Sequence, residues 1–327
     1  MTTRDPELLV MTQNVYFGAN LEPIMQADSP PAMLAAAGEA WSNVVASEIP
    51  ARAEKIARQI AIHKPHLIGL QEVTQWYSGR AGAMQLTYDF LELILISLRG
   101  CGVSYVPLAI ANNFDQTVPI NMEGDLVRLL DRHAILMRVD PPSGLQPYNL
   151  HSAHFSSLVS LPFVLGSVSR SWVAVDAIFN GRRFRLIETH IESFKATTQL
   201  DQARELIAGP INTNLPIIML GDFNSNANQD PGLPDCTPTY PELIAAGLED
   251  AWASVNPGDF GNTGVQAADL RNQTSSLDRR IHLILTRGGF KPTSAELVGA
   301  TPDSRTASGS WPSDHAGIVV SLRLSAA

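Results

Sequence analysis

The stretch Leu215–Ala227, LPIIMLGDFNSNA, places the strongest constraint on how this chain can fold. Residues 217–220 form a continuous apolar run, which is typical of a strand buried on both faces. The run ends at Gly221, and Asp222 and Asn224 follow at once. Because these two residues are two positions apart, their side chains would point the same way in an extended chain. The pattern predicts a polar site at a sheet edge, as in many α/β enzymes.

Asp222 and Asn224 offer complementary chemistry. The carboxylate can bind a cation or accept a proton, whereas the carboxamide can donate a hydrogen bond to an anionic oxygen. An acidic turn after a core strand would also explain this short stretch when it is taken alone. The functional interpretation therefore depends on whether other strands end in the same way.

Two other predicted strands do end in polar residues. Residues 8–17 read as a first strand with Asn14 near its end, and His66–Val73, HLIGLQEV, predicts a buried strand that ends in Glu72. A carboxylate directly after LIGL is costly to bury unless it meets a cation or hydrogen-bond donors, so Glu72 is a candidate metal ligand. The alternatives are a turn-forming asparagine and an exposed strand-end acid.

Three histidines occur in similar settings. His190 ends a predicted strand in the sequence ETHIES, His282 lies within RRIHLIL, and WPSDH places Asp314 beside His315 before the final strand. A lone strand histidine is more often structural than functional. A Ser-Asp turn resembling a helix cap would explain Ser313 and Asp314 but not His315.

Composition limits the kinds of partner. The 327 residues are 45% hydrophobic and 17% charged with a net charge of −9, which indicates a soluble globular protein that repels phosphate backbones. A small or membrane-presented substrate therefore fits better than duplex nucleic acid. The start MTTRDPELLV lacks a secretory pattern, and residues 84–99 are too short and charged to span a bilayer. We expect a cytoplasmic monomer with a single domain over residues 1–327.

Local patterns predict the elements around these residues. Helices are predicted at 50–64, 84–99 and 197–207, and a strand at 104–110. Residues 112–127 are predicted to form a polar loop, and the Pro-, Gly- and Ser-rich residues 140–168 an irregular surface excursion that walls a pocket.

Six motifs follow one another along the chain: Asn14, LQEV around Glu72, THI around His190, GDFN around Asp222 and Asn224, RRIHLIL around His282, and SDH at Asp314-His315. Together they resemble the endonuclease/exonuclease/phosphatase superfamily, which includes deoxyribonuclease-type nucleases, neutral sphingomyelinases and inositol-polyphosphate phosphatases. NVYFGANL, DRHAIL and WPSDHAG look most like a bacterial subgroup. The resemblance covers essentially the whole chain. It implies an α/β fold, a four-layer α/β/β/α sandwich of two mixed β-sheets with helices outside.

The resemblance also implies a metal site in a cleft between the two sheets. Glu72 looks like the principal Mg²⁺ ligand, with Asn14 and Asp314 beside it. Mn²⁺ and Ca²⁺ are alternatives, because all three cations favour hard oxygen ligands.

The same resemblance implies catalytic roles. Asp222 would orient or deprotonate the attacking water, and Asn224 would hold a phosphate oxygen. His190 would stabilise the pentacoordinate state or protonate the leaving oxygen, and His315 would serve as a base or a phosphate contact. These parts suit phosphoryl transfer with in-line water attack.

His282 departs from the pattern. The superfamily motif before SDH usually reads R-[IL]-D, with an Asp that orients the SDH histidine, whereas here Arg280-Ile281 is followed by His282. Asp278 could compensate only if it reached the site. Otherwise His282 is a tolerated replacement in a slower phosphodiesterase, or the site is adapted to another reaction or to binding. Two cationic imidazoles would repel, so one should stay neutral near pH 7.

Three functions follow from these observations. The first is a Mg²⁺-dependent hydrolase of a phosphodiester or phosphomonoester, with a small-molecule or lipid-like substrate. The second is a biosynthetic tailoring enzyme that uses the same metal cleft on a non-phosphate substrate. The third is a catalytically weak binding module. The second draws on apolar residues in the two predicted walls, namely Phe114, Tyr148, Phe155, Leu158, Leu161, Phe163 and Val164.

Overall fold

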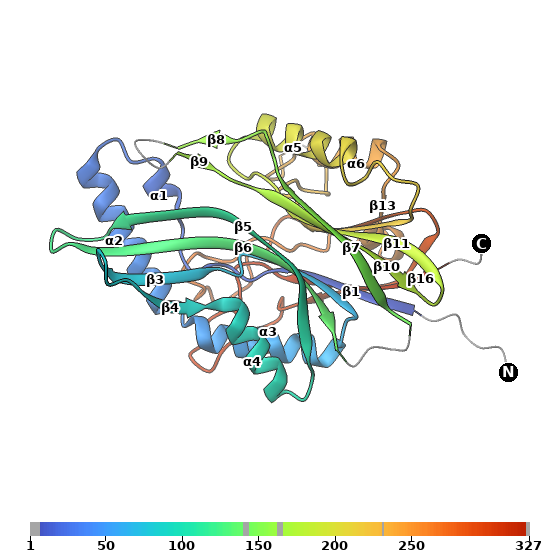
Figure 1. Ribbon diagram of the computed structural model, residues 1–327, viewed down its shortest axis with the longest axis horizontal. Helices are drawn as coiled ribbons and strands as arrows, with labels where there is room; N and C mark the ends of the chain where they lie inside the picture. Colours follow the sequence, from blue (N-terminus) through green and yellow to red (C-terminus); the bar gives the residue numbers. More distant parts are fainter. Residues whose placement is uncertain (1–6, 140–143, 162–165, 231, 325–327) are drawn as a thin grey trace.

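Two β-sheets pack face to face, and helices cover both outer faces (Figure 1). The computed structural model describes residues 7–139, 144–161, 166–230 and 232–324. The first sheet contains, in spatial order, β15 (Phe290–Val298), β16 (Gly317–Leu324), β1 (Glu7–Asn14), β2 (Leu67–Gln71), β6 (Asp125–Arg138), β3 (Gln75–Arg80) and β4 (Gln85–Asp89), while β5 (Tyr105–Pro119) pairs with β6.

The second sheet contains β13 (Glu249–Asp250), β14 (His282–Arg287), β12 (Ile217–Asp222), β11 (Arg182–His190), β10 (Ser171–Phe179) and β7 (Gln146–His154). A small separate ribbon consists of β8 (Val159–Ser160) and β9 (Ser167–Val168). Each large sheet holds one parallel pair, β1 with β2 and β11 with β12, among antiparallel neighbours. The predicted four-layer α/β sandwich with two mixed sheets is therefore confirmed.

The helices divide between the two outer layers. The first sheet is covered by α2 (Pro30–Ala46), α3 (Ile49–His63) and α4 (Phe90–Gly100), and the second by α5 (Ala196–Ala208) and α6 (Thr239–Ala245) (Figure 1). Two shorter helices are α1 (Glu22–Met25) and α7 (Ala251–Val255). Among the described residues, no helix combines the length and apolarity that crossing a bilayer needs.

Strand alternation explains the core. In β1, Leu8 and Val10 pack between the sheets, whereas Met11 faces the helices of the first outer layer. Successive side chains of a strand point to opposite faces, so a strand covered on both sides is apolar throughout. Leu220 of β12 meets β1 and β2 in the same middle layer.

Three local predictions were wrong. Residues 85–89 form β4, so the predicted helix 84–99 begins only at Phe90, where the Asp89 side chain caps it by accepting from the Glu92 amide. Residues 112–127 form the end of β5, a short turn and the start of β6, and not a polar loop. The described part of 140–168 contains β7, an exposed edge strand whose polar residues concealed it.

Candidate active site

The ends of five chain segments converge at one edge of the two stacked sheets. The registers place Asn14 of β1 beside Gln71 of β2, which directly precedes Glu72, and place Asp222 of β12 opposite His190 on one side and His282 on the other. These registers bring together residues predicted at five separate places in the sequence.

Asn14 connects the two sheets at this edge. Its Nδ2 donates to Glu72 Oε1 at 2.8 Å and to Asp222 Oδ2 at 3.1 Å, and its Oδ1 accepts from the Tyr16 amide at 2.9 Å. The amide group is buried. Asn14 therefore holds two carboxylates in a fixed relation, one from each sheet.

Glu72 occupies a demanding backbone position. Its φ of 61° lies in the left-handed region, which non-glycine residues adopt only where the surroundings impose it. Oε2 accepts from the Phe17 amide at 2.9 Å. Burial, and then the charges of Asp314 and Asp131, raise the pKa of Glu72 well above its ordinary value. These acids repel one another, and a divalent cation between them would relieve that repulsion.

The SDH turn is anchored to β1. Ser313 Oγ donates to the Asn14 carbonyl at 2.8 Å and accepts from the His315 amide at 3.1 Å, which fixes the turn. Asp314 Oδ1 lies 3.4 Å from His315 Nε2. Burial raises the pKa of Asp314, although the charges of His315 and Arg52 oppose the rise. Asp314 and Glu72 therefore both have raised pKa values.

Asp222 lies among imidazoles. Its Oδ2 is 3.7 Å from His190 Nε2 and 3.5 Å from His282 Nε2, and its Oδ1 accepts from the Asn224 amide at 3.0 Å. Burial alone would raise the pKa of Asp222, but the three surrounding histidines and the Asn14 amide hold it below its ordinary value. Asp222 is therefore ionised at neutral pH, as a proton acceptor must be.

Gly221 makes the approach of β11 and β12 possible. Its φ is +152°, and a Cβ at this position would lie 2.0 Å from the carbonyl oxygen of Thr189. The glycine that ends the apolar run is thus required by close backbone contact next to Asp222.

His282 and His315 stand edge to face, with ring centroids 4.8 Å apart. Burial lowers the pKa of His282 to about 3, so this ring is neutral near pH 7. Thr263 Oγ1 accepts from the Ile281 and His282 amides and lies 3.2 Å from His282 Nδ1. With both amides donating to it, the hydroxyl has its own hydrogen to give to Nδ1, which leaves the ring proton on Nε2, facing Asp222.

Asp278, by contrast, does not join the site. Its carboxylate lies 2.7 Å from Arg279 Nε and is half exposed. It offers no replacement for the missing superfamily aspartate.

His190 and Asn224 lie at the second-sheet side of the site. Arg170 Nη1 is 2.9 Å from His190 Nδ1, and both this arginine and burial lower the pKa of His190 well below its ordinary value, burial contributing most. Asn224 has a φ of 46° and donates from Nδ2 to the Ile191 carbonyl at 3.0 Å. One of its amide hydrogens thus secures the turn that follows His190.

Three site residues were not predicted from the sequence. Arg170 lies 3.9 Å from Asp131, and Thr263 contacts His282. Asp131 could have been noticed as an acid within the apolar stretch of β6, LVRLLDRHAIL. Arg170 and Thr263 lie in segments with no pattern of their own, so no local signal marks them.

One group could hold a metal ion through imidazole nitrogens. Ligand atoms of Asp222, His282 and His315 all lie within 4.8 Å of one another, and all three side chains are buried. The oxygen-rich alternative consists of Glu72 and Asp314, with Asn14 between Glu72 and Asp222. Among the described residues, the geometry supports a possible metal site at Asp222, His282 and His315, while the role of Glu72, Asn14 and Asp314 as metal ligands stays a prediction.

Comparison with known proteins identifies the family and the fold. Residues 11–315 match the endonuclease/exonuclease/phosphatase family. No curated protein matches the sequence. The fold is similar to that of an endonuclease/exonuclease/phosphatase protein from Bacteroides vulgatus, with a TM-score of 0.59, 15% identity, and coverage of 98% of this chain and 99% of that one.

Two further solved structures share the fold at low identity. A mannosyl-6-phosphatase from Bacteroides thetaiotaomicron has a TM-score of 0.56 and 17% identity, covering 96% of this chain and 99% of its own. TDP2 from D. rerio, solved with a single-strand DNA product, has a TM-score of 0.58 and 14% identity, covering 97% and 99%. The match over residues 11–315 shows that this chain belongs to the endonuclease/exonuclease/phosphatase family of metal-dependent phosphoester hydrolases.

Proposed function

We propose that the protein is a Mg²⁺-dependent phosphoesterase that hydrolyses a phosphodiester or phosphomonoester of a small-molecule or lipid-like substrate. One observation carries the proposal. The ionised Asp222, ringed by three histidines, lies next to the buried Glu72 and the mostly buried Asp314, and burial raises the pKa of both acids. Such a group pairs a proton acceptor with a place for a cation.

The donor set fits a hard divalent cation. Glu72 and Asp314 would hold it, with Asn14 beside them, and Mn²⁺ or Ca²⁺ suits the same oxygens. The raised pKa values of both acids support this assignment, because a cation would stabilise their ionised forms. When bound, the cation would polarise the phosphoryl group and offset its negative charge.

The chain's own residues would handle the protons. Asp222, oriented by Asn14 and by the Asn224 amide, would position the attacking water and accept its proton. His190 and His315 flank this carboxylate, so one is placed to contact the phosphoryl oxygens and the other to protonate the leaving oxygen. Arg170, beside His190, would add positive charge where negative charge accumulates.

Hydrolysis of bis-p-nitrophenyl phosphate and p-nitrophenyl phosphate tests the proposal. We expect turnover with Mg²⁺ or Mn²⁺, no turnover in EDTA, and a loss of about 10³-fold in kcat for Asp222→Asn, within the usual range for removing a general base. Asp278→Asn, which changes an exposed acid outside the site, serves as the matched control and should retain activity. Turnover that persists in EDTA or in Asp222→Asn would contradict the proposal.

The imidazole donors favour a second candidate, a tailoring enzyme that acts on a non-phosphate substrate. Two imidazole nitrogens and one carboxylate suit Zn²⁺ or Fe²⁺ better than Mg²⁺. Titration with Zn²⁺ and Mg²⁺ separates the candidates. Tight Zn²⁺ binding that His282→Ala abolishes, without turnover of either phosphoester under any metal, would favour the second candidate.

A further inference from the structure

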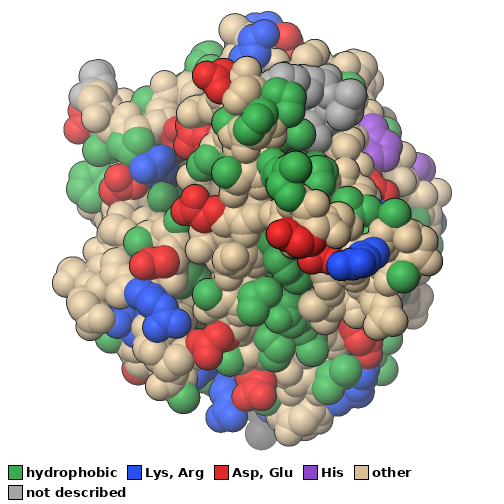
Figure 2. Space-filling model, turned by 90° about the vertical axis from the view of Figure 1, so that its left-hand side faces the viewer, with side chains coloured by type: hydrophobic (Ala, Val, Ile, Leu, Met, Phe, Trp, Pro, Cys, Tyr) green, Lys and Arg blue, Asp and Glu red, His purple; other side chains and the backbone are tan. Residues whose placement is uncertain are grey.

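A cavity of about 470 Å³ opens beside the candidate active site. It lies between α1 and α2 on one side and strands β3, β5 and β6 on the other. Figure 2 shows the corresponding end of the molecule, where hydrophobic side chains gather in the middle of the face among acidic and basic groups. The volume falls within the range of about 300–1,000 Å³ that small-molecule sites occupy.

Alternation along β5 builds one wall of this cavity. Phe114, Gln116 and Val118 line it, whereas Asp115 and Thr117 between them are exposed on the opposite face. Residues two apart share one face of a strand, so the wall follows from the strand that replaced the predicted loop. The pocket predicted near residues 112–127 is thus present, but a hairpin forms it.

The neighbouring strand β6 continues the wall toward the site. Val127 and Leu129 line the cavity and pair with Val118 and Gln116 of β5, and Asp131 follows on the same face. The wall is therefore apolar over most of its length and becomes acidic at its inner end.

The opposite side of the cavity is apolar as well. Leu21, Ile24 and Met25 from α1 and its entry line it, and Trp41 of α2 lies with its ring centroid 5.9 Å from that of Trp76. The indole nitrogen of Trp76 donates to the Phe17 carbonyl at 3.0 Å. That hydrogen bond satisfies its polar atom, so Trp76 offers the cavity an apolar ring.

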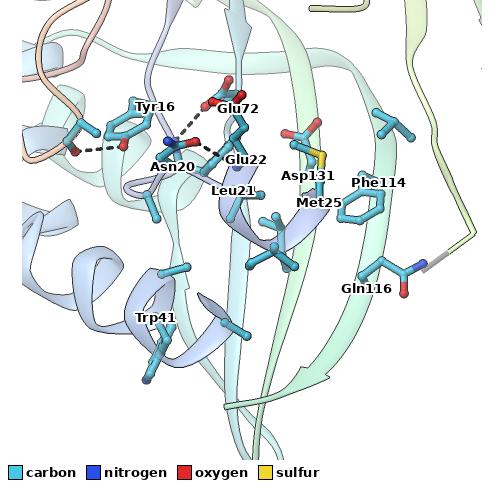
Figure 3. Close-up of a pocket in the computed structure, with 18 of the residues that line it drawn as sticks. Tyr16, Asn20, Leu21, Glu22, Met25, Trp41, Glu72, Phe114, Gln116 and Asp131 are labelled. Carbon is cyan, nitrogen blue, oxygen red and sulfur yellow. Dashed lines mark hydrogen bonds between the residues drawn. The ribbon is translucent and has the colours of Figure 1, made fainter. Parts of the chain in front are cut away.

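Most charged groups of the lining lie at the inner end, whereas Gln116 is a polar residue of the apolar wall. Glu72, Asp131, Arg170 and Asp314 all border the cavity there. Figure 3 shows Glu72 and Asp131 at one end, with Met25 beside Asp131, and Trp41 at the other end, with Leu21 between the two ends. A ligand that fills the space would therefore be charged at one end and apolar at the other.

Of the apolar residues predicted to line a pocket, the structure places two in this cavity. Phe114 and Leu161 contribute to the lining. Phe155 is buried in the core beneath α5, while Tyr148 and Leu158 do not border the cavity. Phe163 and Val164 lie outside the described residues.

We propose that this cavity binds an apolar alkyl or aryl group of the substrate, so that the protein acts on an amphipathic phosphoester. The inference rests on the proposed phosphoesterase function and specifies its substrate class. Sugar hydroxyls or nucleotide phosphates placed among Leu21, Trp76 and Val118 would lose water, and the mostly apolar lining offers them few hydrogen-bond partners in return. An alkyl chain or an aromatic ring has no hydrogen bonds to water to lose there, and it gains apolar contact along the whole wall.

Binding of short phosphonates, which are not hydrolysed, tests the proposal directly. Methyl-, hexyl-, octyl- and phenylphosphonate would be titrated by calorimetry with Mg²⁺ present and below micelle-forming concentrations. A fully buried methylene strengthens binding by about fourfold, so octylphosphonate should bind at least about 30-fold more tightly than methylphosphonate. The hexyl and octyl compounds test for an alkyl chain, and the phenyl compound tests for an aryl group. Equal affinities for all four would overturn the proposal.

Neighbouring residues on β5 supply a variant and its matched control. Val118→Asp places a charge in the cavity, and Thr117→Asp places the same charge on the exposed face of the same strand. The octyl-to-methyl affinity ratio should fall by about tenfold in Val118→Asp and stay at the wild-type value in Thr117→Asp. An unchanged ratio in Val118→Asp would contradict the assignment of the cavity.

A second pair of variants covers the case in which Val118→Asp fails to fold. Ala40 of α2 lines the cavity, so Ala40→Leu should shorten the longest chain that binds while leaving methylphosphonate unaffected. Ala35→Leu, at an exposed position of the same helix, is the control. Octyl binding that stays at the wild-type level in Ala40→Leu would refute the proposal.

Binding and turnover separate this inference from the proposed function. Chain-length-dependent binding without hydrolysis of any phosphoester would reject the phosphoesterase and keep the cavity. Metal-dependent hydrolysis of p-nitrophenyl alkyl phosphates with the same kcat/KM for methyl and octyl esters would support the phosphoesterase and reject the role of the cavity in binding an apolar group.

Discussion

His282 replaces a carboxylate with a neutral ring that faces Asp222. The Nε2 of His282 lies 3.5 Å from Asp222 Oδ2, and the Thr263 hydroxyl fixes the other ring nitrogen. A donor at this position favours the ionised form of Asp222. The residue therefore changes the charge at this position and keeps Asp222 ready to accept a proton.

Removal of that donor should move the acidic limb of the pH–rate profile. In His282→Ala the burial of Asp222 is less well opposed, so its pKa rises and kcat begins to fall at a higher pH than in the wild type. His282→Asp should move the limb further, because a second carboxylate repels the first. We expect shifts of about one pH unit or more, measured as kcat against pH with Mg²⁺ at saturation. An unmoved acidic limb in both variants would show that His282 does not act on Asp222.

Strand β12 delivers Asp222 only because Gly221 lets it lie against β11. Gly221→Ala should destabilise the protein by about 3 kcal/mol, because a methyl group 2.0 Å from the Thr189 carbonyl forces the parallel pair apart. Gly289→Ala is the matched control, since its φ of +93° is equally unfavourable but nothing lies within 4 Å of the added Cβ. Urea unfolding of both variants isolates the contribution of the contact. Equal losses of stability would mean that only the backbone angle matters.

Helix α3 ties the loop that follows Asn14 of β1 to the loop that carries Asp314. Buried Arg52 donates to the carbonyls of Val15 and Tyr16 at 2.9 Å and of Pro312 at 3.2 Å. Burial lowers its pKa to about 10, so it stays charged at neutral pH.

Arg52 also donates from Nε to the Ser47 carbonyl at 2.9 Å, so Arg52→Met should leave four carbonyls without this donor and lower the free energy of unfolding by about 3 kcal/mol. It should also weaken Mg²⁺ binding, because Asp314 then lacks a fixed position. Arg58→Met, at an exposed site of the same helix, should change neither quantity. Calorimetric unfolding and Mg²⁺ titration of both variants measure the two effects. Equal changes in stability and in Mg²⁺ affinity for Arg52→Met and Arg58→Met would contradict the anchoring role of Arg52.

Elements whose signal is local were predicted well. The apolar run into Gly221 and Asp222, the helix at 50–64 and the final strand at 317–324 each depend on neighbours within a few residues, and the structure confirms them as β12, α3 and β16. Asn180-Gly181, a residue pair typical of hairpin turns, likewise joins β10 to β11 and has positive φ at both residues.

Features whose partners lie far away in the sequence were missed. Nothing near Arg52 in the sequence indicates that a charged residue is buried there, yet it is fully buried because three distant carbonyls accept its hydrogen bonds. Arg170 resembles a solvated residue before a strand until His190 is seen beside it. The β5–β6 hairpin was read as a loop because Gln116 interrupts an inner face that borders a cavity.

The whole molecule carries a stability penalty at the buried carboxyl group of Glu72. Glu72 has a raised pKa in the folded protein, so near neutral pH the unfolded chain holds it ionised more readily than the folded one does. Metal-free protein therefore loses stability from this group as pH rises from the ordinary value of 4.5 up through the raised value. Each unit of the shift corresponds to about 1.4 kcal/mol.

Mg²⁺ should remove this penalty, so its stabilising effect should grow with pH between about 5 and 8, since ligand binding to the folded state adds to the free energy of unfolding. The lowered pKa values of His190 and His282 have the opposite effect below pH 6.5. There the unfolded chain binds protons at these histidines that the folded protein does not bind, so the free energy of unfolding rises with pH. Both histidines are also present in the Glu72→Gln variant. Subtracting the free energy of unfolding of this variant from that of the wild type therefore cancels the contribution of the two histidines.

The difference in unfolding free energy between wild type and Glu72→Gln, followed by urea titration in EDTA, should therefore become less favourable to the wild type as pH rises. With Mg²⁺ the sign should reverse, because only the wild type has the full carboxylate to bind the cation. Asp222 does not disturb the comparison: its lowered pKa keeps it ionised in both states above pH 5. A wild-type advantage that stays constant with pH and is unaffected by Mg²⁺ would show that Glu72 neither carries the penalty nor holds the metal.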